Sequence, residues 1–142
     1  MQILNGSNRS LPELAILLAG ICLAVQALLP SAAQATEWEC GERSNLPLQG
    51  KNYCAAGDFR LSQANLLELL DQLLEKHRLA FGDADALQRA QTSFESYRDH
   101  QCAAENKRIE DKPYHPMVVS QCKTRFTNIR IEELKQLQQQ KL

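Results

Sequence analysis

This chain of 142 residues contains five cysteines, and the four that lie outside its apolar N-terminal segment constrain most strongly how it can fold. They follow an apolar N-terminal segment and are Cys40, Cys54, Cys102 and Cys122. An even number of cysteines in a small exported domain predicts two disulfides, and four cysteines allow three pairings. Zinc binding is the competing interpretation, but no C-x-x-C pair occurs and the histidines are scattered. We therefore expect two disulfides, no metal and no other cofactor.

The segment 1–35 has the composition of a secretory signal peptide. Arg9 precedes the apolar run LAILLAGICLAVQALL at residues 14–29, and a proline and the small-residue sequence SAAQA follow it. Cleavage after Ala35 would make Thr36 the first residue of the mature chain. The run is shorter than the roughly 20 residues of a membrane-spanning helix, although a retained membrane anchor is the alternative. We expect export to the periplasm or the extracellular space.

The mature chain carries almost no net charge. Of the 16 basic and 17 acidic residues, 15 and 16 lie after the predicted signal. Nonspecific nucleic-acid binding depends on surplus positive charge, and binding to anionic membranes depends on a basic amphipathic stretch. Because the sequence has neither, we expect a protein partner, no nucleic acid, and no stable membrane insertion after signal removal.

A leucine-rich segment predicts the first helix of the mature chain. Its leucines cover a broad face of a helix over about 61–80, which Ser62 can cap and Gly82 can end. The stretch CGERSNLPLQGKNYC before it contains a proline and two glycines, which are typical of a loop. We therefore expect a cysteine-containing N-terminal loop region over residues 36–60 and a helical domain over residues 61–142.

Two further apolar stripes predict a helical hairpin. One indicates a helix over about 83–107, which Asp83 or Asp85 can cap. The other indicates a helix over about 115–138, with Pro116 in its first turn. No alternating β pattern competes with them. The sequence thus predicts a small all-α fold of three helices, in which disulfides staple the structure and the hairpin packs on the preceding helix.

The helical rise favours one disulfide pairing. At about 1.5 Å per residue, Cys102 lies roughly 7 Å before the loop of the hairpin and Cys122 roughly 10 Å beyond it. In an antiparallel hairpin the two are nearly level, within the Cα separation of about 6 Å that a disulfide needs. We therefore pair Cys102 with Cys122 and Cys40 with Cys54. The first bridge closes a loop of about 20 residues and would contribute on the order of 3 kcal/mol.

Two motifs flank the predicted loop of the hairpin: QTSFESYRDHQC ends at Cys102, and CKTRFTNIRIEEL begins at Cys122. They resemble the Q-x-x-W-x-x-[YF]-R-D-x-x-C and C-x4-T-x2-R-x3-L segments of the lysozyme inhibitor LprI family of bacterial envelope proteins. The resemblance covers about residues 61–137. Phe94 stands where that family usually has Trp, the connection NKRIEDKPYHPM replaces a shorter turn, and the family tends to be helical between its first two cysteines.

The resemblance implies an exported helical protein that inhibits a lysozyme by protein–protein binding. Such an inhibitor needs a rigid scaffold that presents a protruding segment to a cleft, because rigidity limits the entropy lost on association. The alternative is a non-catalytic periplasmic interaction or adaptor module with another partner. We expect no enzymatic activity, since G-x-S-x-G, H-E-x-x-H and phosphate-loop motifs are missing from the sequence.

Two sets of polar residues are candidate functional groups. Arg98, Asp99, Thr127 and Arg130 could direct a guanidinium toward the catalytic carboxylates of a lysozyme. We favour the alternative, an internal cluster of ion pairs and hydrogen bonds between the two helices of the hairpin. The preferred contact segment is instead the connection KRIEDKPYH, because loops on rigid elements often carry recognition. Its candidate contact residues are Arg108, Lys112, Tyr114 and His115, and the competing interpretation is a solvated surface turn.

Overall fold

Three α-helices make up most of the chain that the computed structural model describes, residues 37–140. Helix α2 spans Leu48–Phe81, α3 spans Asp85–Glu105 and α4 spans His115–Gln139. Two short 3₁₀ turns, η2 and η3, span Arg43–Asn45 and Lys107–Ile109. The described residues contain no strand, and the all-α prediction is confirmed. The signal peptide expected over residues 1–35 lies outside the described residues.

Helix α2 begins earlier than the sequence indicates, and the loop prediction is wrong for residues 48–60. Pro47 stands at the N-cap in an extended conformation, so it starts the helix instead of breaking it. Gly50 is buried under the ring of Trp38, and a Cβ at this position would lie 3.0 Å from that ring. Packing of the tryptophan therefore outweighs the low helix propensity of the glycine.

The expected caps are only partly present. Ser62 does not begin a helix: it is buried within α2, and its hydroxyl donates to Oδ1 of Asn128 at 2.6 Å. Gly82 ends α2 as expected, with φ of 84° and its N–H bonded to the Arg78 carbonyl oxygen at 2.9 Å. Such left-handed backbone conformations favour glycine, because it has no Cβ. The N-cap residue of α3 is Ala84, so neither nearby aspartate takes that position.

The core joins all three helices. Helix α2 contributes Leu66, Leu70 and Leu73, whose spacing puts them on one face. Leu87 of α3 and Leu134 of α4 complete the buried cluster. Partly buried apolar side chains extend it: Leu69, Leu74, Phe94, Ile131 and Leu137. The leucine stripe recognised in the sequence is thus the core-facing side of α2.

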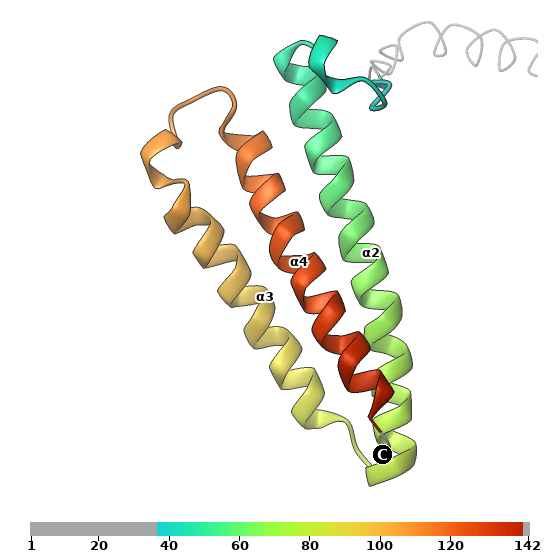
Figure 1. Ribbon diagram of the computed structural model, residues 1–142. Coiled ribbons are helices and arrows are strands. Elements are labelled where there is room, and N and C mark those ends of the chain that lie inside the picture. Colours follow the sequence, from blue (N-terminus) through green and yellow to red (C-terminus); the bar gives the residue numbers. More distant parts are fainter. Residues whose placement is uncertain (1–36, 141–142) are drawn as a thin grey trace, which may run out of the picture. The chain divides into compact units, whose positions relative to one another are not determined.

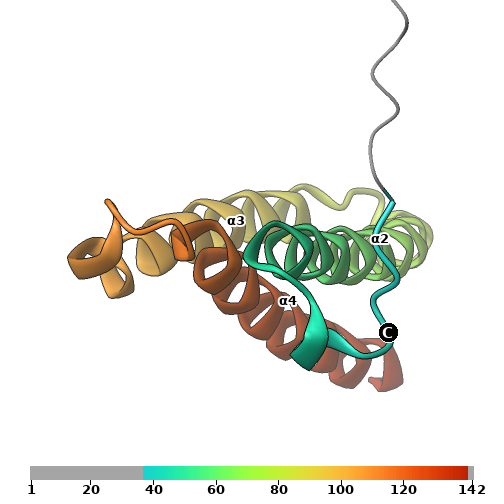
Figure 2. The same ribbon diagram turned by 90° about the horizontal axis from the view of Figure 1, so that it is seen from above.

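Helix α4 lies between α2 and α3 in Figure 1. It runs antiparallel to α3 and parallel to α2, as two hydrogen bonds between α2 and α4 show. Ser62 bonds to Asn128, and Gln72 accepts from Gln138 at 3.3 Å. Helices α2 and α3 diverge from the turn that joins them (Figures 1 and 2). The predicted hairpin therefore packs on α2 mainly through α4.

Both predicted disulfides are confirmed. Cys102 and Cys122 join α3 to α4 with a Cα separation of 5.7 Å, and Cys40 and Cys54 join the N-terminal segment to α2 with one of 5.6 Å. Cys102 is completely buried and Cys122 nearly so. The bridge at Cys102 thus fixes the register of the hairpin next to its connecting segment.

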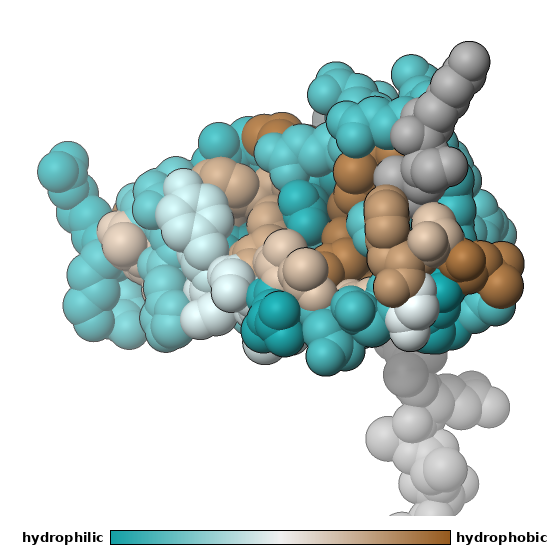
Figure 3. Space-filling view, turned by 90° about the horizontal axis from the view of Figure 1, so that it is seen from below, coloured by the Kyte–Doolittle hydropathy of each residue, from teal (hydrophilic) through white to brown (hydrophobic). Residues whose placement is uncertain are grey.

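Several large apolar side chains are exposed at the surface of the described residues. Leu79 and Phe81, near the end of α2, are 80% and 60% exposed. Figure 3 views the molecule from the side of this end and shows apolar residues gathered among hydrophilic ones. Within residues 37–140, none of the helices combines the length and apolar composition needed to cross a bilayer.

Candidate partner-binding surface

Arg98 occupies the space between the three helices. It is 5% exposed, and its guanidinium donates to Asp99 at 2.9 Å, to Gln63 at 2.6 Å and to Thr127 at 3.3 Å. The ring centroid of Phe59 in α2 lies 5.0 Å from its Cζ atom, a distance typical of cation–π contacts. A buried guanidinium with these contacts is unavailable to an external partner.

Asp99 lies at the exposed end of this cluster. Its Oδ1 accepts the bond from Arg98, and the ammonium group of Lys123 in α4 lies 3.3 Å from the same oxygen. Desolvation raises the pKa of Asp99, but the hydrogen bond and charge of Arg98, together with Lys123, outweigh it and hold that pKa below its usual range. The carboxylate is therefore ionised at neutral pH and balances the buried guanidinium.

Arg130 lies beside this cluster without bonding to it. Its guanidinium donates to Glu133 at 2.9 Å and to Gln91 at 3.4 Å, and its Cζ lies 5.6 Å from the Phe94 ring centroid. The structure thus brings Arg98, Asp99 and Thr127 into direct contact, whereas Arg130 shares only the Phe94 ring with Arg98. We propose that all four residues stabilise the packing of the helices.

Two members of the cluster come from a part of the chain that sequence reasoning did not associate with it. Phe59 and Gln63 lie on α2, and residue 59 falls in the segment expected to be a loop. Their spacing of four residues would have placed them on one face had the helix been recognised there. The missed signal is therefore the early start of α2.

The connection between α3 and α4, residues 106–114, is tied to the scaffold at both ends. The buried side chain of Asn106 donates to the Cys102 carbonyl oxygen at 2.8 Å. At the other end, the Asn52 side chain of α2 donates to the Pro113 carbonyl oxygen at 3.2 Å. Figure 2 shows the connection at one extremity of the described domain. It is a protruding segment whose two ends are held in place.

Backbone hydrogen bonds order the connection internally. The N–H of Ile109 bonds to the carbonyl oxygen of Asn106 at 3.1 Å, and the N–H of Lys112 bonds to that of Ile109 at 2.9 Å. A further bond of 3.0 Å from the N–H of His115 to the Lys112 carbonyl oxygen leads into α4. Successive turns of this kind leave little backbone freedom to lose on binding.

The charges on the connection are mostly neutralised within it. Lys107 pairs with Glu110, and its hydrogen bond holds the pKa of that carboxyl below its usual range. Lys112 pairs with Asp111 at 2.8 Å. Arg108 is exposed and has no carboxylate partner among the described residues. Of the expected contact residues, Arg108, Lys112 and Tyr114 are exposed, whereas His115 is half-buried.

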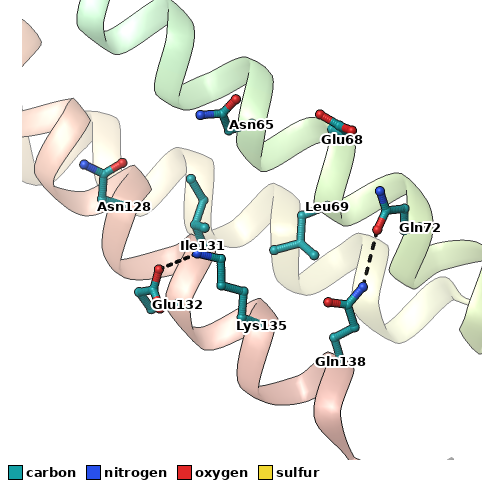
Figure 4. Close-up of a pocket in the computed structure, with 9 residues that line it drawn as sticks. All are labelled: Asn65, Glu68, Leu69, Gln72, Asn128, Ile131, Glu132, Lys135 and Gln138. Atoms are coloured by element: carbon teal, nitrogen blue, oxygen red, sulfur yellow. Dashed lines mark hydrogen bonds and ion pairs between the residues drawn. The ribbon is translucent and has the colours of Figure 1, made fainter.

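The surface of the described residues carries several depressions. One, of about 330 Å³, lies at the base of the connection and is lined by Ala103, Ala104, Val119, Asp99, Lys107, Glu110, His115 and Lys123. Another, of about 610 Å³, lies between α2 and α4, and no residue of the connection lines it. In Figure 4, Leu69 and Ile131 lie within this groove, while amide and charged side chains surround them. Its lining contains no His, Cys, Ser or Thr that could act as a nucleophile.

The described residues hold no group of three or more His, Cys, Asp or Glu side chains placed to bind a metal ion. The three helices and two disulfides of the described residues define a class of small protein. It is a three-helix domain with one disulfide across its hairpin and another at its N-terminal end.

The chain belongs to the LprI family of lysozyme inhibitors. The family model described as "Lysozyme inhibitor LprI" matches residues 41–134, which include all three helices in whole or large part. An uncharacterized protein of Rhizobium meliloti (strain 1021) is 31% identical over 119 residues, covering 76% of this chain and 84% of that protein. No solved structure matches the chain significantly.

Proposed function

We propose that this chain is an exported protein that inhibits a lysozyme by binding it. Membership of the family described as lysozyme inhibitors carries this proposal. The two disulfides support export, because such bonds persist in oxidising compartments. The signal-peptide pattern of residues 1–35 supports it as well, with Thr36 as the first residue of the mature protein.

The contact surface that we propose is the connection between α3 and α4, with Arg108, Lys112, Tyr114 and His115. It protrudes, its ends are held by Asn106 and Asn52, and a disulfide lies one turn before it. A segment that is already ordered loses little entropy when it enters a cleft. Arg and Tyr are also enriched among the residues that dominate binding energies.

Lysis of bacterial cell walls by a lysozyme, followed by turbidity, tests this function. The oxidised mature domain, beginning at Thr36, should slow lysis when it is present in amounts close to those of the enzyme. A variant with residues 107–114 replaced by a Gly-Ser turn should remain folded and lose inhibition. The matched control changes the opposite turn, with Asp83→Ser and Ala84→Ser, and should inhibit like the wild type.

Each result has a defined consequence. Full inhibition by the folded Gly-Ser variant would eliminate the connection as the contact surface. Unchanged lysis with several classes of lysozyme, even in large excess of the domain, would refute the inhibitor proposal. In that case, recovery of another envelope protein with the immobilised domain would favour the adaptor alternative.

A further inference from the structure

Arg108 differs from the other positively charged side chains that were considered for binding a partner. Arg98 is buried, and the Arg130 side chain is 16% exposed and pairs with Glu133. Lys107 and Lys112 pair with carboxylates of their own segment. Among the expected contact residues, Arg108 is the one fully charged side chain that is exposed and has no carboxylate partner in the described part of the chain.

The backbone around Arg108 is fixed. The residue lies in the middle of η3, between Lys107 and Ile109. Ile109 is half-buried and anchors one side of this turn, and Asn106 anchors the other through its bond to Cys102. Arg108 therefore belongs to an ordered, exposed turn that follows Cys102 by six residues. Only its side-chain rotamers must be ordered on binding.

The active site of a lysozyme has chemistry that complements such a group. Glycosidases of this kind carry two carboxyl groups beside the scissile bond, and in lysozyme one of them stays ionised at neutral pH. A guanidinium can bind a carboxylate through two parallel hydrogen bonds, which a lysine cannot do. We propose that Arg108 enters the catalytic cleft and binds the ionised carboxylate, an inference that rests on the proposed inhibitor function.

Single substitutions at this segment test the inference. With a c-type lysozyme that the wild-type domain inhibits, Arg108→Ala should raise the concentration for half inhibition by about 30-fold or more, the loss expected when one partner of a buried charge pair is removed. Arg108→Lys should recover only part of this loss. Lys112→Ala removes the same charge from the same segment and should have a much smaller effect, because Lys112 already pairs with Asp111.

Two further measurements separate recognition from folding and locate the contact. The melting temperature of Arg108→Ala should equal that of the wild type, since the side chain is exposed. Affinity should then be measured against a lysozyme whose ionised catalytic carboxylate has been changed to the amide. The wild-type domain should bind this enzyme more weakly, whereas Arg108→Ala should show little additional loss, which is the coupling expected of a direct pair.

The outcomes distinguish this inference from the function on which it rests. A wild-type domain that inhibits no lysozyme refutes both. If the wild type inhibits and Arg108→Ala inhibits equally well, only the role of Arg108 is refuted. Loss of affinity in Arg108→Ala without coupling to the carboxylate would place the contact outside the catalytic centre and overturn the inference.

Discussion

Arg98 illustrates how a small domain can bury a charge. Its guanidinium reaches one carboxylate, one amide and one hydroxyl, and its Cζ atom lies 5.0 Å and 5.7 Å from the ring centroids of Phe59 and Phe94. Because Asp99 is half exposed, the pair keeps contact with water at one end. The arginine thus supplies donors to all three helices while avoiding the full desolvation of an ion pair.

We predict that Arg98→Ala lowers the free energy of unfolding by about 2–4 kcal/mol, because the change removes charged hydrogen bonds and leaves a cavity. Denaturant titration followed by circular dichroism measures this difference. Arg89→Ala, at an exposed position of the same helix, is the control and should change stability by less than about 0.5 kcal/mol. Equal stabilities for the two variants would show that the cluster around Arg98 does not stabilise the fold.

Asp99 should make the stability of the domain sensitive to acid. Its pKa is lowered in the folded state, so its contribution is present above the unfolded value of about 3.9 and is lost as pH falls through the lower folded value. As pH falls below about 4, the wild type should therefore lose more stability than Asp99→Asn. Denaturant titrations at several pH values measure the two slopes, and parallel curves would contradict the expected titration.

At the scale of the elements, the first turn of α2 packs against Trp38, which precedes the helix in the chain. Pro47 and Gly50 are local signals for a loop, yet Pro47 suits a helix start and Gly50 makes room for Trp38. In a sequence, a glycine that allows close packing cannot be distinguished from a glycine that allows a turn. This ambiguity explains why the boundary could not be predicted.

The packing of Trp38 on Gly50 can be tested by fluorescence, because the chain contains one tryptophan. Gly50→Leu should displace the indole toward solvent and shift its emission to longer wavelength. Gly57→Ala is the matched control in the same helix, since its Cβ would meet only the end of the Arg60 side chain at 3.7 Å. Gly57→Ala should leave the wavelength of the tryptophan emission unchanged and stabilise the helix by up to about 1 kcal/mol. Identical spectra for Gly50→Leu and the wild type would argue against the contact.

The disulfide between α3 and α4 should contribute to both stability and inhibition. Replacing Cys102 and Cys122 by alanine should lower the free energy of unfolding by about 3 kcal/mol and weaken inhibition, because the connection next to the bridge loses its rigid support. The corresponding change of Cys40 and Cys54 should also destabilise the domain but preserve inhibition. Equal inhibition by both folded double variants would show that rigidity at the hairpin is unimportant.

At the scale of the whole molecule, the hairpin was predictable from the sequence because its constraints are local. The positions of Cys102 and Cys122 on either side of a short connection set the register, and the observed Tyr97–Phe126 and Arg98–Thr127 contacts follow from it. The placement of α4 between α2 and α3 was harder to predict from the sequence, because no disulfide joins α2 to the hairpin. Its register depends on side-chain packing and on bonds such as that of Ser62 to Asn128.

The position of the connection in the fold was predictable from the sequence, but its internal contacts were not. The position of the connection beside a bridge is evident from the sequence, as are its arginine and tyrosine. One of its ends is held by a hydrogen bond from Asn52, which lies far away along the chain in α2. The pairing of Lys107 and Lys112 within the connection, which distinguishes Arg108 from them, also requires the folded backbone.

Hydrogen–deuterium exchange tests most directly whether the connection is the binding surface. The oxidised domain should be measured alone and in the presence of the lysozyme that it inhibits. Binding should slow exchange in residues 106–115 of this chain and around the catalytic cleft of the enzyme, with little change along the outer face of α2. Protection confined to other parts of the domain, or absent from the catalytic cleft, would contradict inhibition through this segment.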